Sequence, residues 1–177
     1  MLKFALNSLS VILSDRQSLK LFQGETEELI RIFDEDNGYD VFESLLIPRV
    51  VGIEDSSRRW SVAMVLEHLC LTNTDMHKAI ASLSAGIVPR GEIDVALYKP
   101  DPEIGIDVRE RLLSINAEYS RLIQTLLESA GRLRRKPLYR HPWFGYLSAH
   151  QWHVLAALHQ RIHRRQAQKI VAMLGVT

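Results

Sequence analysis

The sequence predicts an all-α protein built from long helices packed as a bundle. Apolar residues recur at three- and four-residue intervals over long stretches, which is the period of a helix with one buried face. Glycines and prolines gather between those stretches, where they mark loops. The chain has 177 residues, 46% of them hydrophobic and 24% charged, as is ordinary for a soluble globular domain. Because no linker or repeat divides the chain, we expect residues 1–177 to form a single domain.

The first helix is expected near the N-terminus, either continuous or broken once. Its apolar positions follow helical spacing and continue past Gly24; they are Leu2, Leu6, Leu9, Leu13, Leu19, Phe22, Leu29, Ile30 and Phe33. Segment 1–13 superficially resembles a signal peptide, but Asn7 and the serines interrupt the apolar run, so we interpret it as an amphipathic helix. Asn37-Gly38 is expected to end the helix as a turn. Residues 42–48 fit either a short helix or an extended connection.

The second helix is expected from about Ser57 to Leu83, in a segment that is apolar on almost every side and therefore buried. Glycines and prolines then interrupt the chain repeatedly, at Gly86, Pro89, Gly91, Pro100, Pro102 and Gly105. This punctuation predicts a long crossing loop without regular structure.

The third helix is expected to begin at about Asp107 and to stop at Gly131, a residue type that suits a helix C-terminus. Its apolar face is formed by Leu112, Leu113, Ile115, Tyr119, Leu122, Ile123, Leu126 and Leu127. After a second loop, Ser148 with Gln151 three residues later forms a capping box. The fourth helix is therefore expected to begin there.

The fourth helix carries two histidines, His159 and His163, four residues apart. A helix turns by about 100° per residue, so a four-residue step returns both imidazoles to nearly the same face. They continue the stripe of Trp152, Leu155 and Ala156, which is expected to face the core. This is metal-ligand spacing, but such a pair is more often a surface or hydrogen-bonded pair, so a third ligand is required.

His68 is the third candidate ligand, because it lies in the apolar segment 62–71. A buried imidazole is unfavourable unless its nitrogens have partners, and a metal ion provides one. Three neutral imidazoles leave coordination positions open, as in catalytic sites, whereas structural zinc sites usually close with four ligands rich in cysteine. The single cysteine, Cys70, cannot supply such a closed site.

With these motifs the chain resembles the DinB/YfiT-like superfamily of metalloenzyme-type four-helix bundles. The resemblance covers most of the chain from about Ser57 onward and rests on Trp60-Ser61, Glu67-His68-Leu69, the run His141-Pro142-Trp143-Phe144-Gly145-Tyr146-Leu147-Ser148, Gln151-Trp152, His159, His163 and Gln166. It implies a DinB/YfiT-like four-helix bundle with long crossing loops. It also implies a divalent metal, with zinc or nickel expected, held by His68, His159 and His163. Some relatives are transferases or isomerases that use low-molecular-weight thiols.

Several residues near the histidines have two interpretations. Asp75 lies two turns beyond His68 and can orient a ligand imidazole, but we favour a solvated residue near the helix end. Glu67 points about 100° away from His68 and is expected to be exposed rather than catalytic. His150 and His153 lie off the ligand face, and we expect them to be surface or hydrogen-bonding residues.

His141 lies in a loop, before Pro142, and can fold toward the mouth of a pocket. We favour a structural interpretation, in which Trp143 and Phe144 plug the end of the bundle and Gly145 permits the turn. The candidate proton donors, among which spacing selects none, are Tyr98, Tyr119 and Tyr146.

Positive charge is concentrated in the C-terminal third, which has no Asp or Glu beyond Glu128 but carries Arg132, Arg134, Arg135, Lys136, Arg140, Arg161, Arg164, Arg165 and Lys169. We favour neutralisation by neighbouring acidic segments of the bundle; the alternative is attraction of an anionic substrate, such as a carboxylate-bearing thiol, or of nucleic acid. No nucleic-acid-binding motif occurs, and no stretch approaches the roughly 20 apolar residues that span a bilayer. We therefore expect a cytoplasmic protein, with neither nucleic acid nor membrane as a partner, and compatible with a homodimer.

The common catalytic templates are missing from the chain. It has no glycine-rich phosphate loop and no G-x-S-x-G elbow, and the segment from His159 to His163 lacks the glutamate of H-E-x-x-H peptidases. The expected function is that of a metal-dependent enzyme acting on a small molecule, with thiol-dependent transfer first and metal-assisted hydrolysis second. The alternative is a non-catalytic binding or structural bundle whose metal site is inert or empty.

Overall fold

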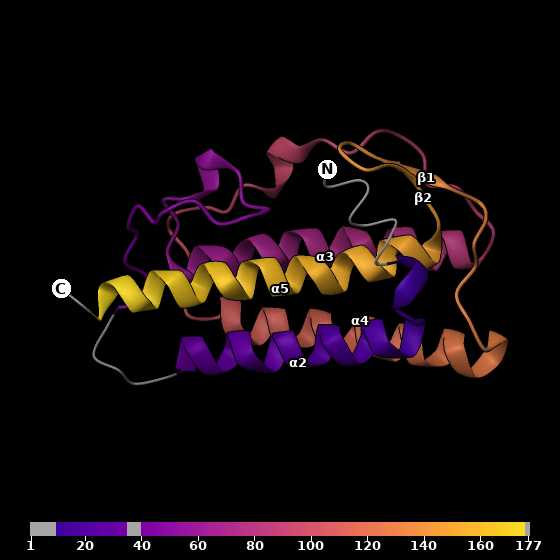
Figure 1. Cartoon of the computed structure of the whole chain (residues 1–177), viewed down its shortest axis with the longest axis horizontal. Helices are drawn as coiled ribbons and strands as arrows, with labels where there is room; N and C mark the ends of the chain where they lie inside the picture. Colours follow the sequence, from indigo (N-terminus) through magenta and orange to yellow (C-terminus); the bar gives the residue numbers. More distant parts are fainter. Residues whose placement is uncertain (1–9, 35–39, 176–177) are drawn as a thin grey trace.

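The computed structural model describes residues 10–34 and 40–175. Four long helices form a bundle (Figure 1), and they are α2 Asp15–Asp34, α3 Val62–Ser84, α4 Val108–Ala130 and α5 Ala149–Leu174. The connections contain the 3-10 helices η1 Asp55–Ser57 and η2 Val95–Tyr98 and an antiparallel hairpin of β1 Tyr139–His141 and β2 Gly145–Leu147. The predicted all-α four-helix bundle is therefore confirmed.

Helix boundaries follow local capping signals. The first helix is broken at residues 13 and 14, and its expected apolar positions before residue 10 and the turn at Asn37-Gly38 lie outside the described residues. Helix α3 begins at Val62, later than predicted, because Ser61 is its N-cap and accepts a hydrogen bond from the Met64 amide. Segment 42–48 is not helical. The stop at Gly131, with φ of 72°, and the capping box of Ser148 are both as predicted.

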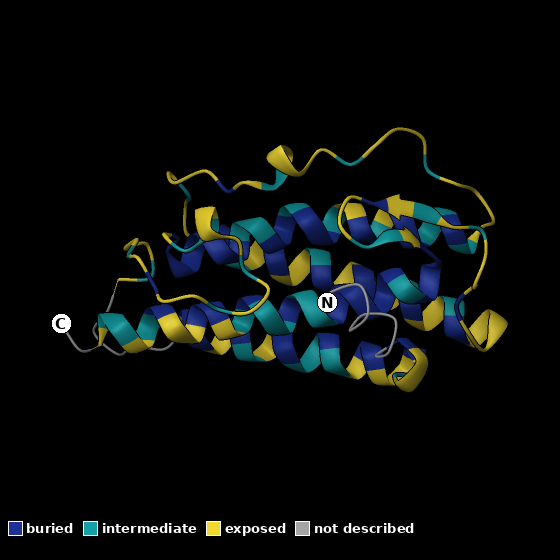
Figure 2. Ribbon diagram, turned by 45° about the horizontal axis from the view of Figure 1, so that its top comes forward, coloured by how far each residue is buried: buried dark blue, intermediate teal, exposed yellow. Residues whose placement is uncertain are grey.

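The directions of the helices explain the long crossing loop. Helices α2 and α5 lie side by side and run the same way, and so do α3 and α4, whereas the two pairs run in opposite directions (Figure 1). Helices α3 and α4 are consecutive, so their connection must return along the bundle, roughly 35 Å for a helix of this length. Residues 85–107 make this return along the α3 and α5 side, as an exposed strip over the buried helix faces (Figure 2).

A layer of polar side chains divides the core into two apolar clusters. Each helix contributes one residue: Asn73 donates to Asn116 at 2.8 Å, and Asn116 and Gln160 both donate to the Thr26 hydroxyl, at 2.9 and 3.2 Å. Because a buried polar group is unfavourable without its partner, this layer favours one register of the four helices.

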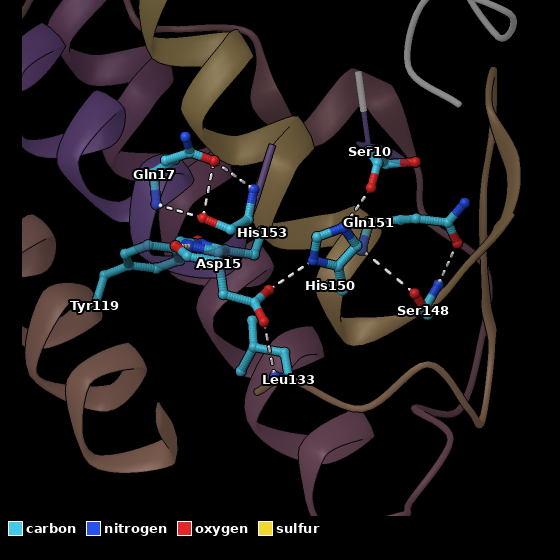
Figure 3. A network of polar contacts seen from close by, with 10 residues as sticks. Ser10, Asp15, Gln17, Tyr119, Leu133, Ser148, His150, Gln151 and His153 are labelled. Carbon is cyan, nitrogen blue, oxygen red and sulfur yellow. Dashed lines mark hydrogen bonds and ion pairs between the residues drawn. The ribbon is translucent and has the colours of Figure 1, made fainter. Parts of the chain in front are cut away.

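A second polar network ties the start of α5 to the N-terminal segment (Figure 3). The imidazole of His150 and the carboxylate of Asp15 point toward one another, with Nδ1 and Oδ1 2.6 Å apart. His153 donates from Nε2 to the Asp15 carbonyl at 3.0 Å and accepts from the Tyr119 hydroxyl at 2.6 Å. Both histidines are fully buried, so of the two predicted roles they have the hydrogen-bonding one.

Candidate metal centre

Three histidines converge between two antiparallel helices. His68 projects from α3, and His159 and His163 project from α5. The Nε2 atom of His159 lies 3.3 Å from Nε2 of His68 and 3.1 Å from Nε2 of His163. The three can each offer a ligand atom within 4.8 Å of the others. The predicted convergence of the three imidazoles is therefore confirmed.

The crossing loop fixes the ring of His68. Its Nδ1 lies 2.7 Å from the backbone carbonyl oxygen of Tyr98, in η2. A carbonyl only accepts hydrogen bonds, so Nδ1 must carry the proton, and Nε2 keeps its lone pair. The loop that returns from α3 to α4 thus selects the tautomer of His68 that can bind a metal through Nε2.

The ring of His163 is fixed in the same way by Gln166, one turn later on α5. The Gln166 amide nitrogen donates to the Ser57 carbonyl at 2.7 Å, which turns its oxygen toward His163 Nδ1, 2.8 Å away. Nδ1 of His163 therefore donates, and Nε2 again presents a lone pair to the cluster. Such partners of ligating imidazoles are typical of metal sites.

With all three imidazoles neutral, no placement of the ring hydrogens gives every nitrogen of the cluster a hydrogen-bond partner. Nε2 of His159 carries at most one hydrogen, which cannot satisfy the lone pairs of both His68 and His163. If that hydrogen is on Nδ1 instead, it is buried without a hydrogen-bond partner among the described residues. An electron-pair acceptor between the rings would satisfy all three nitrogens. Their separations of 3.1 and 3.3 Å are close to the roughly 3.4 Å expected around a tetrahedral ion with bonds near 2.1 Å.

Burial keeps the three imidazoles neutral. It lowers the pKa of His68 to about 4, against the opposing effect of the hydrogen bond to Tyr98. The pKa values of His159 and His163 lie well below the usual value, because both rings are buried and neighbouring imidazoles disfavour a second positive charge. The neutral ring is the form that binds metal ions.

The histidines line a cavity of about 940 Å³ between α3, α5, the crossing loop and the hairpin. Its walls are mostly apolar and include Trp60, Met76, Ile93, Trp143, Trp152 and Leu155. The Trp60 ring stacks on His163, with centroids 6.1 Å apart, and also contacts His68. A cavity of this size accommodates a small organic molecule.

The acidic residues near His68 do not reach the cluster. Asp75 accepts hydrogen bonds from the Tyr98 hydroxyl at 2.9 Å and from Lys78 at 3.0 Å, so it contacts none of the three imidazoles. The prediction that Glu67 is exposed is wrong, because its side chain is 13% exposed and pairs with Arg111 at 2.6 Å. The reason is that α4 packs on this side of α3 and brings its own cation.

The hairpin differs from its predicted role. Trp143 is 58% exposed, so the prediction that it plugs the end of the bundle is wrong, although Phe144 does pack against the core and Gly145 does take a left-handed conformation, with φ of 76°. The inward position belongs to His141, which is buried and lines the cavity.

Other candidates are separated by their surroundings. Of the three tyrosines considered as proton donors, only Tyr98 lines the cavity, because Tyr119 is buried in the network at the start of α5 and Tyr146 is 66% exposed. The Cys70 thiol is buried in the apolar core, and burial raises its pKa to about 12. It is therefore not a thiolate nucleophile.

Two partners of the cluster escaped prediction because they are backbone carbonyls, of Ser57 and Tyr98, on distant loops. A pattern of side chains does not predict which backbone carbonyl will accept a hydrogen bond. Gln166 had a usable signal, since a residue three positions after His163 lies on the same helix face.

The expected neutralisation of the basic C-terminal third is present only in part. Glu25 of α2 pairs with both Arg161 and Arg164 of α5. The basic run 132–136 has no ion pair with the described residues.

None of the described helices has a stretch long and apolar enough to cross a bilayer.

Comparison with known proteins gives one structural likeness. No protein-family model and no curated protein matches the sequence. The structure is similar to that of YfiT from Bacillus subtilis, described as a probable metal-dependent hydrolase with an unusual four-helix bundle topology, at a TM-score of 0.59 and 13% identity over 91% of this chain and 87% of that one. At this identity the likeness concerns the fold, and the chain has the DinB/YfiT-like four-helix bundle fold that its motifs predict.

Proposed function

We propose that the chain is a divalent-metal enzyme that catalyses hydrolysis of a small organic substrate. The observation that carries the proposal is the meeting of three Nε2 lone pairs, two of them fixed by protonation of the opposite ring nitrogen, on the wall of a large cavity. A bundle that only required packing at these positions would be more stable with apolar side chains.

The roles of the residues follow from their contacts. His68, His159 and His163 would hold the ion, while the Tyr98 carbonyl and Gln166 hold two of the rings in the ligating tautomer. Imidazole donors suit zinc and nickel, among other first-row ions. When bound, such an ion supplies Lewis-acid chemistry and lowers the pKa of water toward neutrality.

Hydrolysis is favoured over chemistry that needs a protein nucleophile. The one thiol, Cys70, is protonated and buried away from the cavity. Thr72 lies beside the cluster, and its hydroxyl donates a hydrogen bond to the His68 carbonyl at 2.9 Å. The likeness to YfiT, itself described as a probable metal-dependent hydrolase, supports the same choice.

Thiol-dependent transfer is the second candidate, and two cations favour it. Arg90 and Lys99 line the cavity, and no acid among the described residues pairs with either. Of the acids that line the same cavity, Asp75 and Glu92 are paired, with Lys78 and Arg140, whereas Glu54 and Asp94 form no ion pair with the described residues. Two free cations suit the carboxylates of a small thiol substrate.

The test begins with metal analysis of protein purified without an affinity tag. We expect about one divalent ion per chain after loading with Zn²⁺ or Ni²⁺, and loss of that ion in His68→Ala. The matched control is His77→Ala, which removes a histidine of the same helix outside the cluster. Equal metal content in wild type and His68→Ala would contradict the proposal.

The reaction is tested on the loaded protein with a panel of aryl esters, amides and small thiols. Turnover of an ester or amide that His68→Ala abolishes supports hydrolysis, whereas consumption of a thiol and an electrophile supports the second candidate. Metal binding with neither turnover would favour the inert-scaffold alternative. Light scattering of the same samples tests the expected homodimer.

A further inference from the structure

We propose that His141 is a substrate-binding residue, which donates a hydrogen bond from Nε2 to an oxygen atom of a ligand in the cavity. The inference rests on the proposed function only for the reaction that this contact serves. The position, tautomer and free donor of His141 are independent of any metal.

The hairpin fixes the tautomer of His141. Strands β1 and β2 pair His141 with Gly145, so the intervening turn folds back over the imidazole. The backbone amides of Trp143 and Phe144 both donate to Nδ1, at 3.2 and 3.4 Å. Because Nδ1 accepts these bonds it cannot carry a proton, and the neutral ring must hold its hydrogen on Nε2.

The donor faces the cavity. His141 is 9% exposed and lines the same cavity as His159 and Trp152. Among the described residues no group accepts a hydrogen bond from its Nε2. That atom is nevertheless not one of the fully buried polar atoms that lack a partner. Aromatic rings surround the imidazole: the centroid of the His141 ring lies 4.8 Å from that of Phe144 and 5.1 Å from that of Trp152. A donor in an apolar wall is favourable only when water or a ligand accepts from it.

The donor is also uncharged. Burial lowers the pKa of His141 to about 4, so the ring is neutral near pH 7. It lies close enough to the cluster that the positive charge of a protonated His141 ring would lower the pKa of His159. A neutral N–H beside the candidate metal centre suits a carbonyl or carboxylate oxygen, and the surrounding rings suit a flat apolar group attached to it. The ligand class is thus an aryl or similarly apolar acyl compound.

The first test is a measurement of the tautomer in metal-free wild-type protein by long-range proton–nitrogen correlation spectroscopy. We expect His141 to be neutral with its hydrogen on Nε2 from pH 6 to 8. A hydrogen on Nδ1, or an imidazolium at pH 7, overturns the proposal.

The second test adds benzoate, and separately neutral benzamide, to metal-free protein. At least one probe should shift the Nε2 resonance of His141 while leaving that of buried His150 unchanged. The His141→Phe variant should weaken binding about tenfold, as expected for one lost hydrogen bond. In His141→Gln, an amide can both accept from the turn and donate to the probe, so affinity should return to within about threefold of wild type.

The outcomes separate this inference from the proposed function. Absence of a Nε2 shift with both probes, or equal affinity of wild type and His141→Phe, overturns the role of His141. Failure of metal loading with intact benzoate or benzamide binding overturns the proposed function and leaves the role of His141 standing. If His141→Phe is not folded by circular dichroism, the tautomer measurement and the Nε2 shift in wild type still decide.

Discussion

Gln166 holds His163 from one helical turn away, with Oε1 2.8 Å from Nδ1, and its own amide nitrogen is held by the Ser57 carbonyl. The chain of contacts thus runs from a loop backbone, through a buried amide, to a candidate ligand. Each step fixes the direction of the next hydrogen bond. The lone pair of His163 Nε2 is therefore directed at the cluster without any bound ion.

Replacement of Gln166 by Leu should weaken metal binding without removing a ligand. Loss of an orienting partner typically costs about 10–100-fold in affinity, because the ring can then turn or take the other tautomer. Competition of Zn²⁺ with a chromophoric chelator measures the change. The matched control is Gln168→Leu, two residues later and exposed, which should bind as wild type does. Equal affinities of the two variants would contradict the orienting role.

Metal should stabilise the folded protein through the same three histidines. If only the folded form binds, free metal at a hundredfold excess over its dissociation constant adds about 2.7 kcal/mol to the free energy of unfolding. Thermal unfolding with Zn²⁺, Ni²⁺, Co²⁺ or Mn²⁺ measures the shift, and His159→Ala should abolish it. No shift with any of the four ions would favour an inert scaffold.

The three candidate ligands were predictable because their signals are local or helical. The four-residue spacing of His159 and His163 predicts one helix face, and the apolar neighbours of His68 predict burial. Their meeting point was also predictable, since resemblance to a known bundle supplied the arrangement of helices that spacing alone does not contain.

Residues whose partners are distant in the chain were not predictable. His153 depends on a backbone carbonyl of Asp15 and on Tyr119 of another helix. The partners of His141 are close in the chain, but its contacts depend on the conformation of its own turn. No periodicity reports such contacts, so position on a helix face separated His153 from the ligand set without showing that it is buried. The later start of α3 has a local cause, the Ser61 cap, which an apolar run conceals.

Two glycines should respond to alanine in opposite directions. Gly131 ends α4 with φ of 72°, and an added Cβ would meet no atom within 4 Å. Gly131→Ala should therefore destabilise the fold by about 1 kcal/mol through backbone strain alone. Gly24 lies inside α2 with equally open space around it, so Gly24→Ala should stabilise by about 0.5–1 kcal/mol. Urea unfolding measures both changes in the free energy of unfolding. A change of the same sign in the two variants would contradict the backbone conformations assigned to these glycines.

The free energy of unfolding of the metal-free protein should fall as the pH falls from about 6.5 toward 4. Burial lowers the pKa of His153 to about 4, against the opposing effect of its contacts with Asp15. In the unfolded chain this histidine takes up a proton near pH 6.5, whereas in the folded protein it does so only near pH 4. Between these values the unfolded state binds more protons, so acid favours unfolding. His153 alone accounts for a loss of about 3 kcal/mol across the window.

Urea unfolding at pH 7.5, 6, 5 and 4 in the presence of a chelator measures this slope. Burial lowers the pKa of His68 and His141 as well, so the total loss should exceed that of His153 alone. The variant His153→Leu separates the contributions. It should be less stable than wild type at pH 7.5, because the Tyr119 hydroxyl loses its acceptor, but its slope between pH 6.5 and 4 should be shallower than that of wild type. Parallel slopes would mean that His153 does not resist protonation in the folded protein, and the buried network at the start of α5 would then need a different charge state.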